Sequence, residues 1–208
     1  MAHRASPPLL LAVSKGQSIE AIKALHALGI HDFGENYLQE AQGKIQALSA
    51  MPLSWHYIGR VQTNKTSLIA KHFDWVHTLC SLKHARSLNA ARAENNRNSL
   101  QCCIQVNVGN WPEKAGIALS EIEALLEACA SLPHLTIRGL MTLPNPSTTL
   151  AAERAPFHQL NEALEKLNQK GHALDTLSMG MSSDLKAAIL EGATMVRVGT
   201  ALFGPRHE

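Results

Sequence analysis

The chain has 208 residues, of which 45% are hydrophobic and 17% are charged, and its formal net charge is +2. This length allows one sizeable core, and no apolar stretch approaches the ~20 residues that a membrane span needs. No run of Lys and Arg with interleaved aromatic residues is present, which argues against nucleic acid as a partner.

The cysteines and the N-terminal segment indicate a cytoplasmic protein. None of Cys80, Cys102, Cys103 and Cys129 forms a CxxC motif, and each lies in an apolar stretch, as reduced core cysteines do. The first apolar run is too short for a signal peptide. No HExxH motif and no Cys/His cluster predicts a metal.

Strand-like and helix-like segments alternate from one end of the chain to the other. Apolar and β-branched runs predict eight strands, at residues 9–14, 31–34, 55–59, 73–79, 100–108, 135–141, 174–179 and 194–198. Amphipathic spacing predicts helices at residues 19–28, 37–48, 65–71, 82–93, 152–170 and 184–190, and one after a capping box of Ser120 and Glu123. Ser18 is expected to cap the first of these helices.

This regular alternation is typical of a parallel sheet with right-handed crossovers. Eight units favour a modified (β/α)8 TIM-type barrel over an open doubly wound sheet. No linker or repeat divides the chain, so we expect one α/β barrel domain over residues 1–208. The chain ends soon after the last predicted strand, and we therefore expect the usual eighth helix to be missing.

The first strand ends at a lone lysine, Lys15. The run Leu9–Val13 is apolar throughout, as strands buried on both faces are, and barrels place their chemistry at the carboxyl ends of such strands. A solvated lysine that ends the strand is one interpretation. The other is a lysine desolvated by the barrel wall, whose free amine attacks a carbonyl to form a Schiff base.

Other polar residues follow the remaining strands and would converge on the same mouth. Ser178 lies at the carboxyl end of the seventh predicted strand and Ser182 follows it, and Gly199 and Thr200 follow the eighth. Glycine-rich turns in these two loops are typical of phosphate sites in barrels. The alternative is that the serine only caps a helix and that the glycine only makes a turn.

Three further residues have a structural and a functional interpretation each. Arg197 lies within an apolar strand and must pair with a carboxylate or face a cofactor. Asn36 is an N-cap or a pocket residue, and His56 is a packed core histidine or part of the site. The segment GRVQTNKT differs from a Walker A loop at Asn64, which replaces the second glycine, so a nucleotide loop is disfavoured.

The chain resembles the pyridoxal phosphate homeostasis proteins, small single-domain relatives of the alanine racemase barrel. The matching stretches are AVSK, FGENYLQE, WHYIGRVQTNK, IQVNVGNWPEKAGI, RGLMTLP and LSMGMSSDLKAAILEGATMVRVGTALFG. They occur across nearly the whole chain in the order found in the family. Members usually carry a helix before the first strand, whereas here only Met1 to Pro8 precede it.

This resemblance implies pyridoxal 5′-phosphate (PLP) as cofactor, held as a Schiff base by the lysine of AVSK, Lys15. It also implies phosphate contacts near Ser182, Gly199 and Thr200, and a pocket lined by Asn36, His56 and Ser178. Arg197 would lie near the ring or the phosphate, and an arginine at the ring nitrogen keeps that nitrogen unprotonated, which weakens carbanion chemistry.

The function implied is PLP homeostasis in the cytoplasm without catalysis, with PLP and apo forms of PLP-dependent enzymes as partners and no nucleic acid or membrane. We expect a monomer, or a dimer where a second copy compensates for the missing N-terminal helix. One alternative is a fold-type III PLP enzyme such as an amino-acid racemase. Such racemases use a second, β-rich domain and a tyrosine base, and this chain stops at the barrel. A third interpretation is a barrel enzyme for a phosphorylated substrate, with Lys15 as an aldolase-like base.

Overall fold

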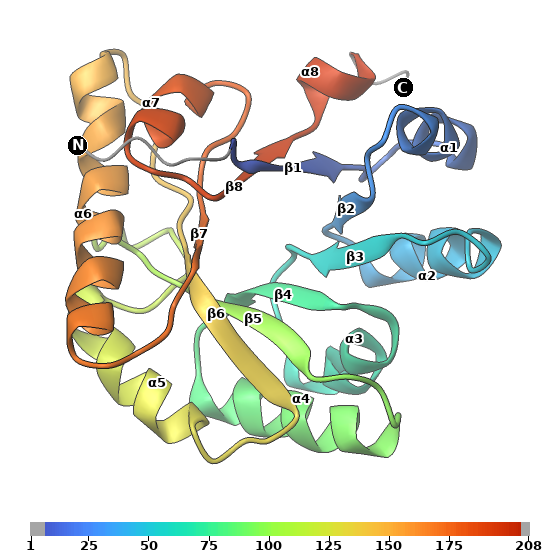
Figure 1. Cartoon of the computed structure of the whole chain (residues 1–208), viewed down its shortest axis with the longest axis horizontal. Helices are drawn as coiled ribbons and strands as arrows, with labels where there is room; N and C mark the ends of the chain where they lie inside the picture. Colours follow the sequence, from blue (N-terminus) through green and yellow to red (C-terminus); the bar gives the residue numbers. More distant parts are fainter. Residues whose placement is uncertain (1–6, 205–208) are drawn as a thin grey trace.

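The strands of this chain are short, buried and parallel, and they close into a barrel in sequence order. A computed structural model describes residues 7–204 (Figure 1). The last strand pairs with the first, at Leu9 with Met195 and at Leu11 with Arg197. The eight strands are β1 (Leu9–Val13), β2 (Asp32–Glu35), β3 (Ser54–Tyr57), β4 (Trp75–Leu79), β5 (Leu100–Gln105), β6 (Leu135–Met141), β7 (Thr176–Ser178) and β8 (Met195–Val198).

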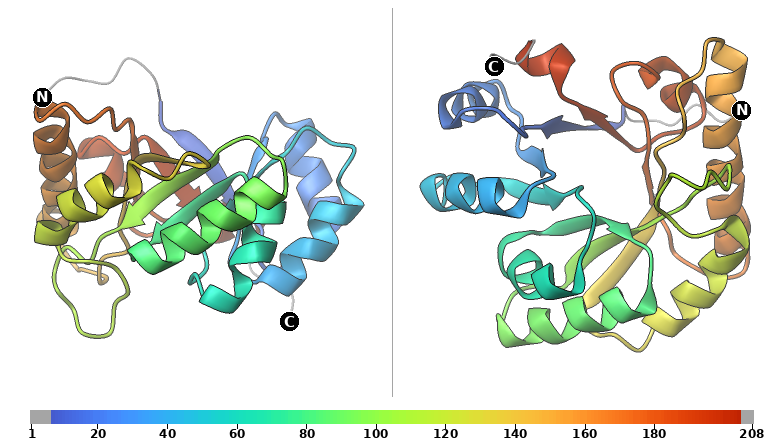
Figure 2. Two further views of the ribbon diagram at one scale, coloured as in Figure 1. Left: turned by 90° about the horizontal axis from the view of Figure 1, so that it is seen from below. Right: turned by 180° about the vertical axis from the view of Figure 1, so that it is seen from behind.

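A helix follows each strand, and helices α1 to α7 surround the barrel (Figures 1 and 2). Their bounds are α1 (Ile19–Ala27), α2 (Leu38–Ala47), α3 (Thr66–His72), α4 (Leu82–Glu94), α5 (Ile122–Cys129), α6 (Leu150–Gln169), α7 (Leu185–Leu190) and α8 (Thr200–Phe203), and short 3-10 turns at Thr63–Lys65 and Leu119–Glu121 precede α3 and α5. The predicted barrel is therefore confirmed, and the open doubly wound sheet is excluded.

Local sequence explains where several helices begin. The Ser18 side chain accepts a hydrogen bond from Ala21 N at 3.1 Å, so the predicted cap of α1 is confirmed. The predicted capping box of Ser120 and Glu123 before α5 is wrong. Glu121, not Glu123, returns its carboxylate to a backbone N–H, that of Ala118, because the helix is preceded by a 3-10 turn.

The core lies between the strands and the apolar faces of the helices, and it includes one buried arginine. Arg92 of α4 is 1% exposed and donates to the carbonyl oxygens of Ala70 at 2.5 Å, Phe73 at 2.8 Å and Asn98 at 2.6 Å. It thus satisfies the carbonyls at the end of α3 that the helix itself leaves unpaired. Cys102, Cys103 and Cys129 are buried, Cys80 is half-buried, and all four cysteines are free.

Two expectations about element boundaries are wrong. A one-turn helix, α8, follows β8 where we expected none, because Gly199 O accepts the N–H groups of Leu202 and Phe203. Strand β5 ends at Gln105 instead of residue 108, since the Asn107 side chain bonds to Trp111 and Lys114 and closes a loop.

That loop, residues 107–117, projects from the barrel in the left view of Figure 2. Of Met1 to Pro8, where we expect no helix before the first strand, residues 1–6 lie outside the part of the chain that the structure describes. None of the helices within residues 7–204 is both long and apolar enough to span a membrane.

Candidate functional site

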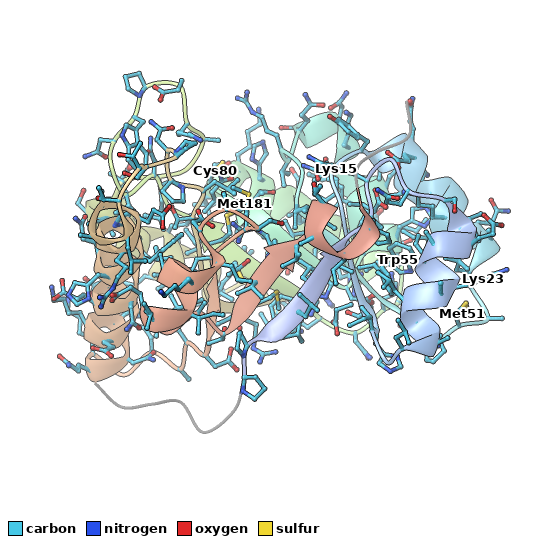
Figure 3. All side chains as sticks on the ribbon, turned by 90° about the horizontal axis from the view of Figure 1, so that it is seen from above. Lys15, Lys23, Met51, Trp55, Cys80 and Met181 are labelled. Atoms are coloured by element: carbon cyan, nitrogen blue, oxygen red, sulfur yellow. The ribbon has the colours of Figure 1, made fainter. Side chains whose placement is uncertain are left out.

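A cavity of about 410 Å³ opens at the carboxyl ends of the strands. Figure 3 shows Lys15 and Met181 at this end of the barrel and Met51 at the other. Apolar side chains, among them Ile58, Met141 and Leu143, form much of its wall. The lining includes six of the eight predicted site residues: Lys15, Asn36, Ser182, Arg197, Gly199 and Thr200.

The cavity is electropositive. Lys15 and Arg197 are the charged residues of its lining, and no carboxylate lies among the lining residues that the structure describes. An apolar wall with two cations suits a flat ligand that carries an anionic group. The Lys15 side chain is half-buried at the end of β1, where the sequence predicted it.

The backbone on both sides of Lys15 is held by a buried ionic network. Lys44 Nζ of α2 donates to Ser14 O at 2.6 Å and to Glu35 at 2.8 Å, and the Ser14 hydroxyl donates to the same Glu35 oxygen at 2.6 Å. Glu40 accepts from both Lys44 and the Gly16 N–H at 2.5 Å. Lys15 therefore lies between two anchored residues and has a fixed backbone.

Glu35 and Lys44 are both buried, at 0% and 6% exposure. Burial raises the pKa of the Glu35 carboxyl, and the bonds from Lys44 and Ser14 oppose that shift. Sequence reasoning missed Lys44. Its spacing of four residues from Glu40 on one helix face was the available signal.

Arg197 does not pair with any carboxylate of the described residues 7–204. Its side chain is buried, and Nη1 donates to Ser178 Oγ at 2.8 Å while Nη2 donates to Thr142 O at 2.9 Å. No Asp or Glu within residues 7–204 forms an ion pair with it. Burial lowers the pKa of this guanidinium to about 10, so it remains a cation at neutral pH. Of its two interpretations, the structural ion pair is wrong.

Asn36 is not the N-cap that its alternative interpretation required. The cap of α2 is Tyr37, which makes no side-chain capping bond. Asn36 Oδ1 is buried and has no hydrogen-bond partner within the described part of the chain. Gly59 packs directly beneath Asn36, because a Cβ on Gly59 would lie 2.1 Å from Asn36 O. An unpartnered acceptor in a cavity wall is available to a ligand.

The turn after β7 carries free backbone donors. The Asp184 carboxylate caps the turn by accepting a hydrogen bond from the Met181 N–H at 2.6 Å, and α7 begins only at Leu185. Ser182 and Ser183 therefore do not cap that helix, and among residues 7–204 their N–H groups have no acceptor. Both serines are exposed at the cavity.

His56 and Ser178 lie beneath the cavity and are absent from its lining. Both are fully buried in the barrel, and a histidine that sequence reasoning missed, His77 of β4, joins them. Burial lowers the pKa of His56 and, to a greater extent, that of His77. Neither Tyr37 nor Tyr57 lines the cavity. No residue of the GRVQTNKT segment, 59–66, is in its lining either, and Thr63–Lys65 of this segment forms a 3-10 turn.

The chain is similar in sequence to many known proteins. Residues 1–207 match the family described as alanine racemase, N-terminal domain. The pyridoxal phosphate homeostasis protein of Pseudomonas aeruginosa is 52% identical over 197 residues, which are 95% of this chain and 84% of the relative. That of Escherichia coli K12 is 44% identical over 200 residues, 95% of this chain and 85% of the relative.

Solved structures agree with this comparison. PipY of Synechococcus elongatus with PLP bound has a TM-score of 0.87 and 39% identity, covering 96% of this chain and 95% of PipY. Its structure without PLP has a TM-score of 0.89 and 40% identity, with 95% and 93% covered. Alanine racemase of Corynebacterium glutamicum, at 19% identity and a TM-score of 0.72, covers 98% of this chain and 57% of the racemase, and shows the shared fold alone.

Proposed function

Because this chain belongs to the pyridoxal phosphate homeostasis protein family, we propose that it binds PLP in this cavity and takes part in PLP homeostasis without catalysis of its own. One observation supports this most strongly. A lysine and a buried arginine without a carboxylate partner line one apolar-walled cavity together with free backbone N–H groups.

The residues present fit PLP group by group. The amine of Lys15 would hold the aldehyde as a Schiff base, with release of water. The turns at Ser182 and Ser183 and at Gly199 and Thr200 offer N–H and hydroxyl donors to the phosphate. The unpartnered Asn36 Oδ1 supplies an acceptor for a polar group of the ligand.

Arg197 argues for storage rather than turnover. PLP supplies an electron sink to enzymes when its ring nitrogen is protonated. Arg197 is a donor that cannot accept, so a ring nitrogen that bonds to it stays unprotonated. A racemase also needs a base on the face opposite the lysine, and neither tyrosine of the chain lines the cavity. In this proposal the protein binds PLP reversibly and releases it to apo forms of PLP-dependent enzymes.

The first experiment treats the protein with PLP, reduces it with borohydride and maps the labelled peptide. We expect one adduct on Lys15 and none in Lys15→Ala. Lys65→Ala, which alters a lysine outside the cavity lining, is the matched control and should be labelled like the wild type. Labelling of Lys65 or Lys114 in the wild type would refute the assignment.

A second experiment tests the absence of catalysis. PLP-loaded protein is incubated with L-alanine and with D-alanine in deuterated water, and deuterium at the α-carbon is measured. We expect no incorporation at enzyme rates. Incorporation at ~1 per second or faster would favour the racemase alternative.

A further inference from the structure

A continuous chain of hydrogen bonds leads from Arg197 through the barrel interior to Asp32. Arg197 Nη1 donates to Ser178 Oγ at 2.8 Å, and Ser178 Oγ lies 2.8 Å from His77 Nδ1. His77 Nε2 lies 2.9 Å from His56 Nδ1, and His56 Nε2 lies 3.0 Å from Asp32 Oδ1. Five different strands, β8, β7, β4, β3 and β2, contribute one residue each.

The direction of the bonds follows from the two charged ends and from neutral imidazoles between them. A carboxylate can only accept, so His56 carries its proton on Nε2 and donates to Asp32. A neutral His56 then accepts at Nδ1 from His77 Nε2, and a neutral His77 accepts at Nδ1 from the Ser178 hydroxyl. A guanidinium can only donate, so Ser178 Oγ in turn accepts from Arg197. Both imidazoles are neutral in this arrangement, as their complete burial favours.

The two residues that end this hydrogen-bond chain, Asp32 and Arg197, are charged and lie at opposite ends of the barrel. Asp32 is the first residue of β2, its side chain is 24% exposed, and it faces away from the cavity mouth. Arg197 lines the cavity. Aligned hydrogen bonds polarise one another, so the carboxylate can stabilise the cation through three neutral groups.

Packing prevents the members of the chain from turning away. The His56 ring stacks on Trp75 with centroids 5.4 Å apart and an angle of 6° between the planes. On the other side, Arg197 Nη2 is held by Thr142 O at 2.9 Å. Two nitrogen atoms of the guanidinium are therefore engaged by the barrel, and the group has one orientation in the cavity wall.

We propose that Ser178, His77, His56 and Asp32 are positioning residues that fix the orientation of Arg197 and thereby the electronic state of the cofactor in the cavity. This inference rests on the proposed function, since it assigns a role to residues beneath the same site. None of the four belongs to the cavity lining, so each acts through Arg197.

The first test removes the charge at the far end of the chain with Asp32→Asn, which keeps an oxygen acceptor for His56. Asp74→Asn is the matched control. Asp74 is half-exposed and lies beside β3 and β4, where it accepts from Trp55 N at 3.0 Å and from Arg97 at 2.6 Å, but it accepts nothing from His56. Both variants lose one negative charge near His56, but only Asp32→Asn alters the hydrogen-bond chain.

We expect Asp32→Asn to weaken PLP binding about fivefold, the fold-change that corresponds to one hydrogen bond of about 1 kcal/mol. The visible absorption band of the bound cofactor should shift as well, which a purely structural role would not cause. Asp74→Asn should leave both the affinity and the band as in the wild type. Equal effects in the two variants, or an unchanged band in Asp32→Asn, would overturn the inference.

The second test measures the protonation of the two histidines of the hydrogen-bond chain in the protein without ligand. Long-range proton–nitrogen NMR spectra should show His77 and His56 as neutral tautomers protonated on Nε2, and a proton on Nδ1 of either would overturn the inference. His77→Gln offers an acceptor and a donor and should retain the wild-type cofactor band. His77→Leu offers neither and should show the shifted band of Asp32→Asn.

The two hypotheses fail in different ways. If the wild type does not bind PLP, the proposed function is wrong. If the wild type binds PLP and Asp32→Asn binds it with the same affinity and the same band, only the positioning role is wrong.

Discussion

A single added methyl group at Gly59 should weaken PLP binding while the protein still folds. A Cβ at this residue would lie 2.1 Å from Asn36 O and 2.9 Å from Asn36 C. The first distance is about 1.3 Å short of ordinary van der Waals contact at 3.4 Å. The obstacle is backbone, so Gly59→Ala must displace the Asn36 peptide and, with it, the unpartnered Oδ1 in the cavity wall.

The expected cost has two parts. Overpacking of this kind lowers the unfolding free energy by about 1–3 kcal/mol. Alanine offsets ~0.4–1 kcal/mol of this loss, because it restricts the unfolded chain more than glycine does. We therefore expect Tm to fall by about 4 °C in a protein of this size. Loss of the Asn36 contact should weaken PLP binding by about tenfold, equivalent to ~1.4 kcal/mol.

Gly43→Ala is the matched control, because it makes the same substitution in α2, and a Cβ there meets nothing within 4 Å. It should raise stability by ~0.5–1 kcal/mol and leave PLP affinity unchanged. Thermal unfolding without ligand and spectrophotometric titration with PLP measure the two quantities. Should Gly59→Ala bind PLP as tightly as Gly43→Ala does, Asn36 has no part in binding and the reasoning is refuted.

Two further predictions concern stability. Arg92→Met should lower the unfolding free energy by about 3 kcal/mol, because three carbonyls, two of them buried, lose their donor. A urea unfolding midpoint that stays within error of the wild type would contradict this. Burial lowers the pKa of His56 and His77 below the unfolded value near 6.5, so their contribution to stability is complete above pH 6.5 and is lost as the pH falls below it. His77→Gln removes one of these groups and should reduce the slope of unfolding free energy against pH, below pH 6.5, by up to ~1.4 kcal/mol per unit. An unchanged slope would show that His77 is protonated in the native protein.

The barrel could be predicted because each strand and helix carries its own local signal. Apolar runs of strand length, Ser18 before α1 and the regular alternation are all properties of neighbouring residues. Element ends depend on contacts that the local pattern does not contain. Strand β5 stops at Gln105 because the Asn107 side chain closes a loop, although the apolar run continues to Val108.

The site was predictable where residues follow strand ends, and not where it depends on long-range pairing. Lys15, Asn36 and Arg197 reach the cavity because parallel strands share one mouth. The bond between His77 and Ser178 joins residues 101 positions apart, and no spacing rule connects them. The hydrogen-bond partner of Arg197 could not be predicted either, because an arginine in an apolar strand can pair with a carboxylate or with a hydroxyl.

The pairing of the first strand with the last has a consequence for the newly made chain. Lys15 follows β1, whereas Arg197, Gly199 and Thr200 belong to the other end of the sequence, and they share a cavity only when β8 has docked on β1. During synthesis the lysine emerges before the residues of β8 and α8 that share its cavity. A ligand that contacts residues from both ends of the sequence binds only the closed barrel. By mass action it therefore opposes the separation of β1 from β8. Ligand occupancy would thus report that the barrel has closed, and protection of the paired strands β1 and β8 from hydrogen exchange should rise with PLP concentration.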